Sequence, residues 1–252
     1  MKVFYKLDEW LNFRKKNEFD LLGFVPTMGA LHAGHLSLIQ KSILDCNKTV
    51  VSIFVNPAQF NDPKDFLKYP KSLETDLKKL KDINVDYVLV PENSVLYADD
   101  YKYKVIETSL SKVLCGKNRP GHFDGVLTIL MKLFHIVKPQ KAYFGEKDYQ
   151  QFLLVKEMVK AFFLDLDIIS SSTIREEDGL AMSSRNQLLS PSEREKAATF
   201  HKILSQNRDK HHINEELQKN GFKVDYVEEF FSRRFSAVSI GSVRLIDNLE
   251  IS

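Results

Sequence analysis

The chain has 252 residues, of which 43% are hydrophobic, and a formal net charge of +2. This length suffices for one large domain, or for a large and a small one. The small net charge gives no basis for nucleic-acid binding, and no apolar run is long enough to span a bilayer. We therefore expect neither a nucleic-acid nor a membrane partner.

The two cysteines, Cys46 and Cys115, are far apart and form no Cys-x-x-Cys pair, which fits a reducing compartment. The first residues of the chain lack the apolar core of a signal peptide. We therefore expect a cytoplasmic protein.

The first predicted elements are a strand at residues 2–5, a helix at 8–16 and a buried strand at 21–25. Pro26 is expected to end the third element because it has no backbone N–H. Gly29 and Gly34 then permit a sharp turn. Apolar residues at 36, 39 and 43 have helical spacing and predict a helix to about residue 45.

His32 and His35 lie where the strand at 21–25 passes into the first turn of this helix. Side chains three residues apart share one face of a helix, and free N–H groups at a helix N-terminus attract phosphate. The pair therefore predicts a site for charge that develops on a phosphate. Two histidines at this spacing also suit zinc, but no nearby Cys, Asp or Glu completes a ligand set, so no metal site is expected.

Residues 49–55 are rich in β-branched side chains and predict a second buried strand. Polar residues at 56–61 follow it, in the crevice where open α/β sheets bind ligands. Ser72 is expected to cap a helix with apolar residues at 73, 77 and 80 and lysines on a solvated face. Further strands are predicted at 87–90 and 103–106.

A turn-rich segment at 119–125 precedes a helix that is predicted to end near residue 137. His122 and His135, in this region, are interpreted as structural or surface residues. A strand at 141–144 leads into a charged helix start at 145–151, and another strand follows at 166–169. This alternation over residues 20–170 predicts an α/β fold with a Rossmann-like, doubly wound parallel sheet.

The remaining chain predicts a smaller C-terminal α+β domain, with a boundary near Thr173. Ser190 and Glu193 form a capping box. Helices are expected at 191–206 and 212–220, a mobile loop at 206–212, and strands near 224, 238 and 244–247. The predicted domains are therefore residues 1–173, which bind the substrates, and residues 174–252, which act as a lid.

Three separate segments offer groups that bind phosphate: the histidine turn, Lys147 after a strand, and the run Ser183-Ser184-Arg185. Together they indicate nucleotidyl transfer, in which an acceptor oxygen attacks the α-phosphate of a nucleotide and pyrophosphate leaves. Neither a Gly-x-x-x-x-Gly-Lys-Ser/Thr loop nor a Gly-x-Gly-x-x-Gly motif is present.

Six motifs occur in order along the chain: PTMGALHAGH at 26–35, VNPAQF at 55–60, RPGHFDG at 119–125, FGEKDYQQ at 144–151, DGLAMSSRN at 178–186 and RLIDN at 244–248. With them, nearly the whole chain resembles the pantothenate synthetase (pantoate–β-alanine ligase) family of the His-x-Gly-His nucleotidyltransferase superfamily. The sequence departs from the family at Ser172, often Pro there, and at Val243, commonly Thr, and its C-terminal part is shorter.

The resemblance implies an AMP-forming ligase of pantothenate and coenzyme A biosynthesis. Pantoate would attack ATP to give pantoyl adenylate and pyrophosphate, and β-alanine would then displace AMP to give pantothenate. Mg²⁺ would bridge phosphate oxygens of ATP, and the enzyme would be a homodimer.

The resemblance also implies residue roles. His35 would be the catalytic histidine, acting with His32, Lys147 and Arg185. Gln59 and Gln151 would bind pantoate, and Gln59 also β-alanine, because an amide both donates and accepts hydrogen bonds. The implied ATP-binding residues are Met28, Gly29, Ala30, Leu31, His32, Ala33, Gly34, His35, Gly145, Glu146, Lys147, Asp148, Ile174, Met182, Ser183, Ser184 and Arg185.

Two other functions remain alternatives at this point. One is a nucleotidyltransferase of the same fold that acts on a phosphorylated acceptor, which would leave the two glutamines unexplained. The other is a nucleotide-sensing or RNA-binding module, which the absence of a basic stripe interleaved with aromatic residues disfavours.

Overall fold

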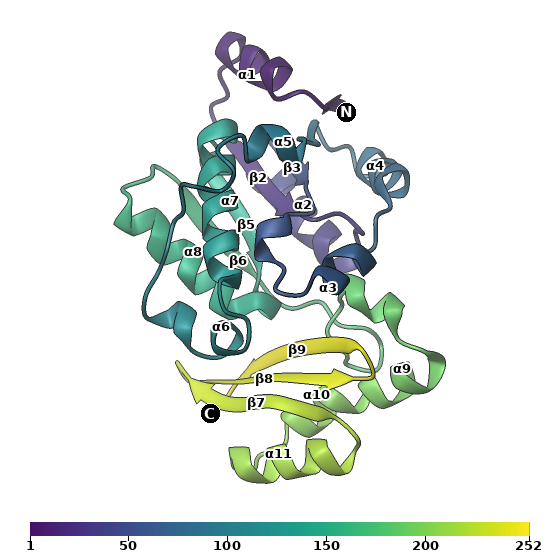
Figure 1. Cartoon of the computed structure of the whole chain (residues 1–252). Coiled ribbons are helices and arrows are strands. Elements are labelled where there is room, and N and C mark those ends of the chain that lie inside the picture. Colours follow the sequence, from purple (N-terminus) through teal and green to yellow (C-terminus); the bar gives the residue numbers. More distant parts are fainter. Residues whose placement is uncertain (252) are drawn as a thin grey trace.

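The computed structural model describes residues 1–251, which form two β-sheets (Figure 1). The larger sheet has six parallel strands in the order β1-β4-β3-β2-β5-β6. These are β1 (Lys2–Phe4), β2 (Leu22–Thr27), β3 (Lys48–Ile53), β4 (Tyr87–Leu89), β5 (Lys141–Gly145) and β6 (Asp167–Ser171). The strand order reverses between β2 and β5, and ligands bind beyond the carboxyl ends of strands at such a switch point.

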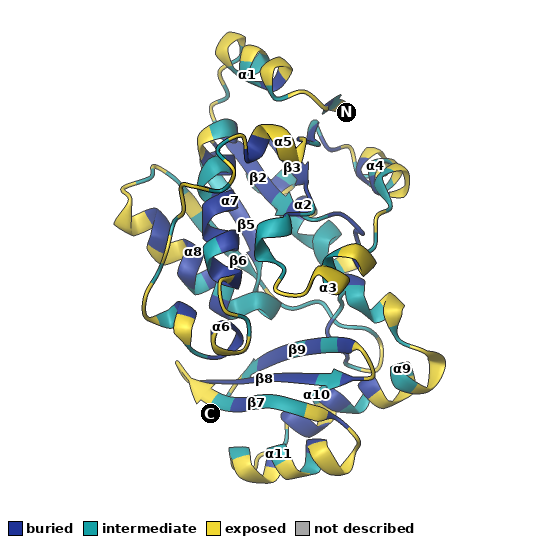
Figure 2. Cartoon of the chain, viewed as in Figure 1, coloured by how far each residue is buried: buried dark blue, intermediate teal, exposed yellow. Residues whose placement is uncertain are grey.

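Helices cover both faces of this sheet. They are α1 (Leu7–Lys16), α2 (Ala33–Asp45), α3 (Pro63–Lys68), α4 (Leu73–Asp82), α5 (Asn93–Leu96), α6 (Cys115–Asn118), α7 (His122–Val137) and α8 (Tyr149–Ala161), with 3₁₀ turns η1 (Pro57–Gln59), η2 (Leu110–Lys112) and η3 (Glu146–Asp148). One apolar core packs the sheet against α1, α7 and α8, and a second packs it against α2 and α4. The central strands are accordingly buried (Figure 2).

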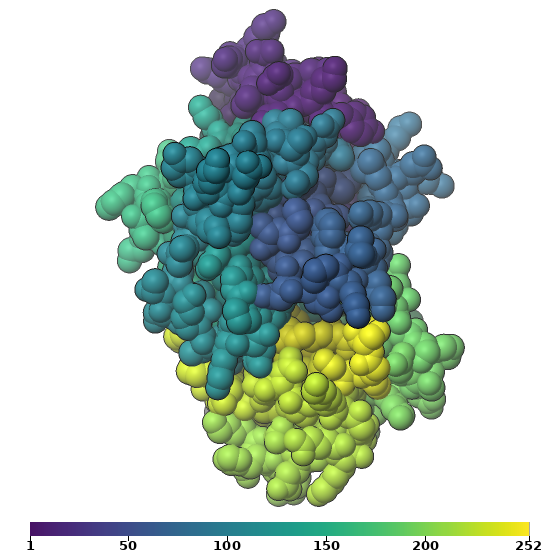
Figure 3. Space-filling view, in the orientation of Figure 1, coloured from purple at the N-terminus to yellow at the C-terminus, as the bar shows by residue number. Residues whose placement is uncertain are grey.

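The C-terminal part has its own apolar core. The 3₁₀ turn η4 (Ser184–Leu188) leads to the helices α9 (Pro191–Ala197), α10 (Thr199–Leu204) and α11 (Lys210–Lys219), and these precede the antiparallel strands β7 (Lys223–Phe230), β8 (Arg233–Ile240) and β9 (Val243–Glu250). Strand β9 contacts η3 at the carboxyl end of β5. The space-filling view shows this part, in light green and yellow, packed directly against the remainder (Figure 3).

The predicted fold class is confirmed: a doubly wound parallel sheet and a small α+β part. No helix among residues 1–251 is both long and apolar enough to cross a membrane.

Pro26 does not end its strand, contrary to the prediction. It lies within β2, opposite Ser52 of β3. On its other side β2 pairs with β5 only at residues 23–24, so the missing N–H of Pro26 leaves no ladder bond unmade.

The strand predicted at 103–106 is also absent. Tyr103 and Ile106 are 79% and 56% exposed, and the N–H of Val105 bonds to Thr128 Oγ1 of α7 at 2.9 Å instead of to a strand. The segment therefore runs over a helix, outside the sheet.

Three smaller predictions also need correction. The hydroxyl of Ser72 makes no cap bond and instead donates to Asp76 Oδ2 at 3.2 Å. The helix predicted at 191–206 is divided at Ala198 into α9 and α10. The last three residues of the predicted loop at 206–212 are the start of α11, because Asp209 caps that helix by accepting from the N–H groups of His211 and His212.

Gly125 lets α7 approach the turn η1 more closely than any other residue would. A Cβ atom at this position would lie 2.3 Å from the carbonyl oxygen of Ala58 and 2.7 Å from the backbone nitrogen of Gln59. The carbonyl of Gly125 also accepts a 3.1 Å hydrogen bond from Asn56 Nδ2. Only glycine at this position therefore allows η1 to pack this closely against α7.

We predict that Gly125→Ala lowers the free energy of unfolding by about 1–3 kcal/mol, because backbone atoms of η1 must move. Urea denaturation measures this change. Gly145→Ala is the matched control: no atom lies within 4 Å of its Cβ position and its φ is −80°, so a change within about 0.5 kcal/mol is expected. Equal stabilities of the two variants would contradict the packing argument.

Candidate active site

A cavity of about 240 Å³ lies beyond the carboxyl ends of β2, β3 and β5, and residues 172–174 and 182–185 close its other side. It coincides with the switch point in strand order. The predicted site residues that line it are Met28, His32, Gly34, His35, Gln59, Gly145, Lys147, Asp148, Gln151, Ile174, Met182, Ser183, Ser184 and Arg185.

The rest of the predicted set does not line the cavity. Gly29, Ala30 and Leu31 are buried in the turn that supports the histidines, and Ala33 is exposed. The side chain of Glu146 lies 3.6 Å from an arginine of β8. These positions shape the site through their backbone.

The turn between β2 and α2 is held by a buried carboxylate. Gly29 and Ala30 have φ values of +79° and +50°, which the surrounding structure must stabilise at Ala30. Asp76 of α4, which is fully buried, accepts 2.8 Å hydrogen bonds from the N–H groups of Ala30 and Leu31. Lys79, one turn further along α4, donates to the carbonyl of Leu31 and so is not part of a wholly solvated face.

The two histidines form a capping box at the start of α2. His32 Nδ1 accepts from the N–H of Gly34 at 3.2 Å, and His35 Nδ1 accepts from the N–H of His32 at 3.3 Å. Because each Nδ1 is an acceptor, each neutral ring carries its proton on Nε2. Both rings line the cavity, so the site holds two imidazole N–H donors.

Both histidines are neutral at pH 7. Burial, followed by the charge of His32, lowers the pKa of His35 from 6.5 to about 3. Burial, followed by the charge of Lys147, lowers the pKa of His32 to about 4. They are therefore neutral hydrogen-bond donors, and the positive charge of the site comes from Lys147 and from arginines.

Gln59 is fixed by hydrogen bonds to both its side chain and its backbone. Its Oε1 accepts from Asn56 Nδ2 at 3.1 Å, and its Nε2 donates to the sulfur of Met28 at 2.9 Å. Its carbonyl accepts from His122 Nδ1 at 2.7 Å and from Arg119 Nη2 at 3.2 Å. His122 therefore belongs to the cavity wall, beyond the structural role predicted for it, while His135 is exposed.

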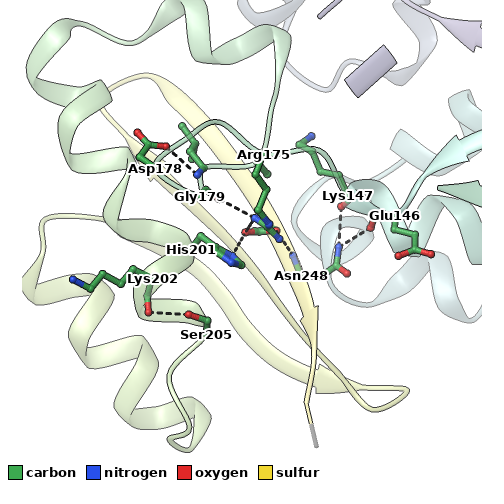
Figure 4. Close-up of polar contacts among 12 residues, drawn as sticks. Glu146, Lys147, Arg175, Asp178, Gly179, His201, Lys202, Ser205 and Asn248 are labelled. Carbon is green, nitrogen blue, oxygen red and sulfur yellow. Dashed lines mark hydrogen bonds and ion pairs between the residues drawn. The ribbon is translucent and has the colours of Figure 1, made fainter. Parts of the chain in front are cut away.

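Residues of β9 hold the segment that carries Lys147. Asn248 Nδ2 donates to the carbonyls of Glu146 and Lys147 at 2.8 and 3.0 Å (Figure 4). The neighbouring Asp247 is buried and pairs with Arg175 at 2.7 and 3.0 Å. One strand thus fixes both η3 and the chain that leads to Ser183.

Arg185 lines the cavity while its guanidinium contacts a carboxylate of α3. Its Nη2 and Nε lie 2.9 and 3.4 Å from the oxygens of Asp65. Ser184 Oγ donates to the carbonyl of Ala30 at 3.0 Å, which joins this segment to the histidine turn.

Some residues of this site were missed or left without a role in the sequence analysis. They are Asn56, Asp65, Tyr69, Asp76, Arg119, His122, Asp247 and Asn248. Asp76 could have been found, because it lies with residues 73, 77 and 80 on the apolar face of its helix. Within residues 1–251, no group of three or more His, Cys, Asp or Glu side chains is arranged to hold a metal ion.

We predict that the free energy of unfolding falls as the pH is lowered from 6.5 to 4. Unfolded histidines bind protons below about pH 6.5, whereas His32 titrates near 4 and His35 and His122 near 3. The unfolded state therefore binds more protons in this window, and each histidine costs up to about 1.4 kcal/mol per pH unit. Urea denaturation at several pH values measures the slope.

His122→Gln removes one of these groups and should flatten the slope by about one proton. A wild-type stability that stays constant between pH 6.5 and 4 would contradict the buried, neutral state of the three rings.

Comparisons with known proteins agree with this geometry. A family model described as pantoate–β-alanine ligase matches residues 1–250. The pantothenate synthetase of Legionella pneumophila (strain Lens) is 53% identical over 249 residues, covering 98% of this chain and 99% of that protein. The pantothenate synthetase of Bdellovibrio bacteriovorus is 50% identical over 237 residues, 94% of each protein.

Solved structures of pantoate–β-alanine ligases have the same fold. The Francisella tularensis enzyme, complexed with β,γ ATP and β-alanine, matches with a TM-score of 0.96 and 39% identity, covering 99% of this chain and 97% of that one. Pantothenate synthetase from Thermus thermophilus matches with a TM-score of 0.92 and 36% identity over 99% of both chains. The chain described here belongs to the pantoate–β-alanine ligase family.

Proposed function

We propose that this chain condenses pantoate with β-alanine in an ATP-dependent reaction, through a pantoyl adenylate, releasing pyrophosphate and AMP. The observation that carries the proposal is that one cavity gathers the two histidines, two glutamines, Lys147 and Ser183–Arg185. The family membership of the chain supports it, as does the Francisella structure with ATP and β-alanine.

In the first step, a carboxylate oxygen of pantoate forms a bond to the α-phosphorus, and the bond to the pyrophosphate oxygen breaks. We propose that the Nε2–H groups of His32 and His35 and the ammonium of Lys147 stabilise the negative charge that develops on this phosphate. Because both imidazoles are neutral with a proton on Nε2, they can donate hydrogen bonds to the nucleotide without first gaining or losing a proton. Arg185 must exchange Asp65 for a phosphate to take part, so this ion pair competes with ATP.

The other predicted roles belong to the same proposal. The turn at 28–35, the segment 145–148, Ile174 and the segment 182–185 bind ATP. Gln59 and Gln151 bind pantoate, and Gln59 also contacts β-alanine. We expect Mg²⁺ to enter bound to the phosphate oxygens of ATP, and a homodimer, which light scattering would detect as twice the 29.1 kDa mass of the chain.

We predict that the protein with ATP, Mg²⁺ and pantoate alone exchanges labelled pyrophosphate into ATP, because the first step needs no amine and is reversible. Addition of β-alanine should then release AMP and pantothenate in equal amounts, without ADP. His35→Ala should lower the exchange rate about a hundredfold or more while the variant stays folded.

Each rival function gives a different result in this assay. A transferase for a phosphorylated acceptor would ignore pantoate, and a binding module would show no exchange. Absence of pantoate-dependent exchange in folded wild-type protein would overturn the proposed function.

A further inference from the structure

Arg119 is a largely buried cation without a counter-charge among residues 1–251. Of the five N–H bonds of a guanidinium, one is directed to the Nε2 of His122 at 3.0 Å and one to the carbonyl of Gln59 at 3.2 Å. Both partners are neutral acceptors. The nearby carboxylate of Asp65 is already paired with Arg185. Three N–H bonds of Arg119 thus remain for a ligand.

The surroundings of Arg119 are unfavourable to its positive charge. Burial, followed by the charges of Arg185 and Arg244, lowers the pKa of Arg119 from 12.5 to about 10. Moving a cation out of water without an opposite charge costs free energy. Arg185 and Arg244 are already paired with Asp65 and Asp225, so an anion bound to Arg119 would supply the opposite charge that this guanidinium lacks.

Arg119 also lines the substrate cavity. It lines both that cavity and a second, smaller one of about 30 Å³, which extends toward β7–β9. Neither His32 nor His35 lines the smaller cavity. Lys147 and Asp148 line both cavities together with Arg119, and the guanidinium of Arg119 lies beside the backbone carbonyl of Gln59.

We propose that Arg119 binds the carboxylate of β-alanine and so selects an ω-amino acid over a simple amine. This inference rests on the proposed function. In the second step, the amine nitrogen forms the amide bond to the pantoyl carbon, and the bond from that carbon to the phosphate oxygen breaks with AMP as leaving group. The ammonium form of β-alanine loses one proton to water before the attack, and the nitrogen loses a second proton to water or AMP as the amide forms. The carboxylate of β-alanine is not consumed and needs a fixed partner, which a guanidinium provides through paired hydrogen bonds.

The carboxylate of pantoate is a less suitable ligand for Arg119. It is the nucleophile of the first step, and pairing with a cation would withdraw the charge with which it attacks. The two carboxylates also enter at different steps, so the two half-reactions distinguish them.

The test compares Arg119→Gln with wild type in both half-reactions. Pantoate-dependent pyrophosphate exchange should fall less than about tenfold, because the variant removes only one of the hydrogen bonds that hold Gln59. The KM for β-alanine should rise by about a hundredfold, as expected for loss of a desolvated charge pair. Lys117→Gln, two residues away on an exposed part of α6, removes the same charge outside the cavity and should change neither value.

A specificity ratio separates carboxylate binding from a structural role. The ratio of kcat/KM for β-alanine to that for propylamine, in which a methyl group replaces the carboxylate, should fall at least about tenfold in Arg119→Gln. Should this variant fail to fold, Arg119→Lys keeps the charge but loses the paired hydrogen bonds and should lower the ratio in the same direction.

An unchanged ratio in a folded variant would overturn the inference, as would a rise in the KM for pantoate equal to that for β-alanine. A wild-type protein without pantoate-dependent exchange would instead overturn the proposed function itself.

Discussion

The carboxylate of Asp76 holds the turn on which the active site depends. It is fully buried and accepts two 2.8 Å hydrogen bonds from backbone N–H groups of the turn between β2 and α2. Hydrogen bonds to a charged group contribute about 1.5–3 kcal/mol each, so they can hold Ala30 at its positive φ. Because α2 begins three residues after Ala30, these bonds also determine where His32 and His35 lie.

In this site the histidines donate hydrogen bonds, whereas other side chains carry the positive charge. Burial keeps the two histidines neutral, with both Nε2–H groups available in the cavity. The positive charges come from Lys147, Arg119 and Arg185, of which Lys147 lies 3.5 Å from Asp148 and Arg185 lies 2.9 Å from Asp65. An anionic substrate therefore meets preorganised hydrogen-bond donors together with cationic side chains, which is the arrangement that stabilises charge developing on a phosphate.

The sequence predicted the architecture because strands, helices and glycine turns leave local patterns. The alternation over residues 20–170 and the pair His32/His35 are patterns of this kind. Contacts between distant segments leave no such pattern. The pairing of Arg185 with Asp65 and the hold of Asn248 on η3 join segments about a hundred residues apart. The prediction for Pro26 was wrong for the same reason. A proline can lie within β2 only because β5 stops pairing with β2 before residue 26.

The pantoate-dependent pyrophosphate exchange rate of Asp76→Asn tests most directly whether Asp76 positions the two histidines. The amide keeps the shape of the carboxylate but can accept only one of the two N–H bonds, so His32 and His35 should shift. The pantoate-dependent exchange rate should therefore fall at least about tenfold in folded protein. Ser72→Ala removes only the weaker 3.2 Å bond to the same carboxylate and should stay near wild type. A folded Asp76→Asn protein with the wild-type exchange rate would contradict the account.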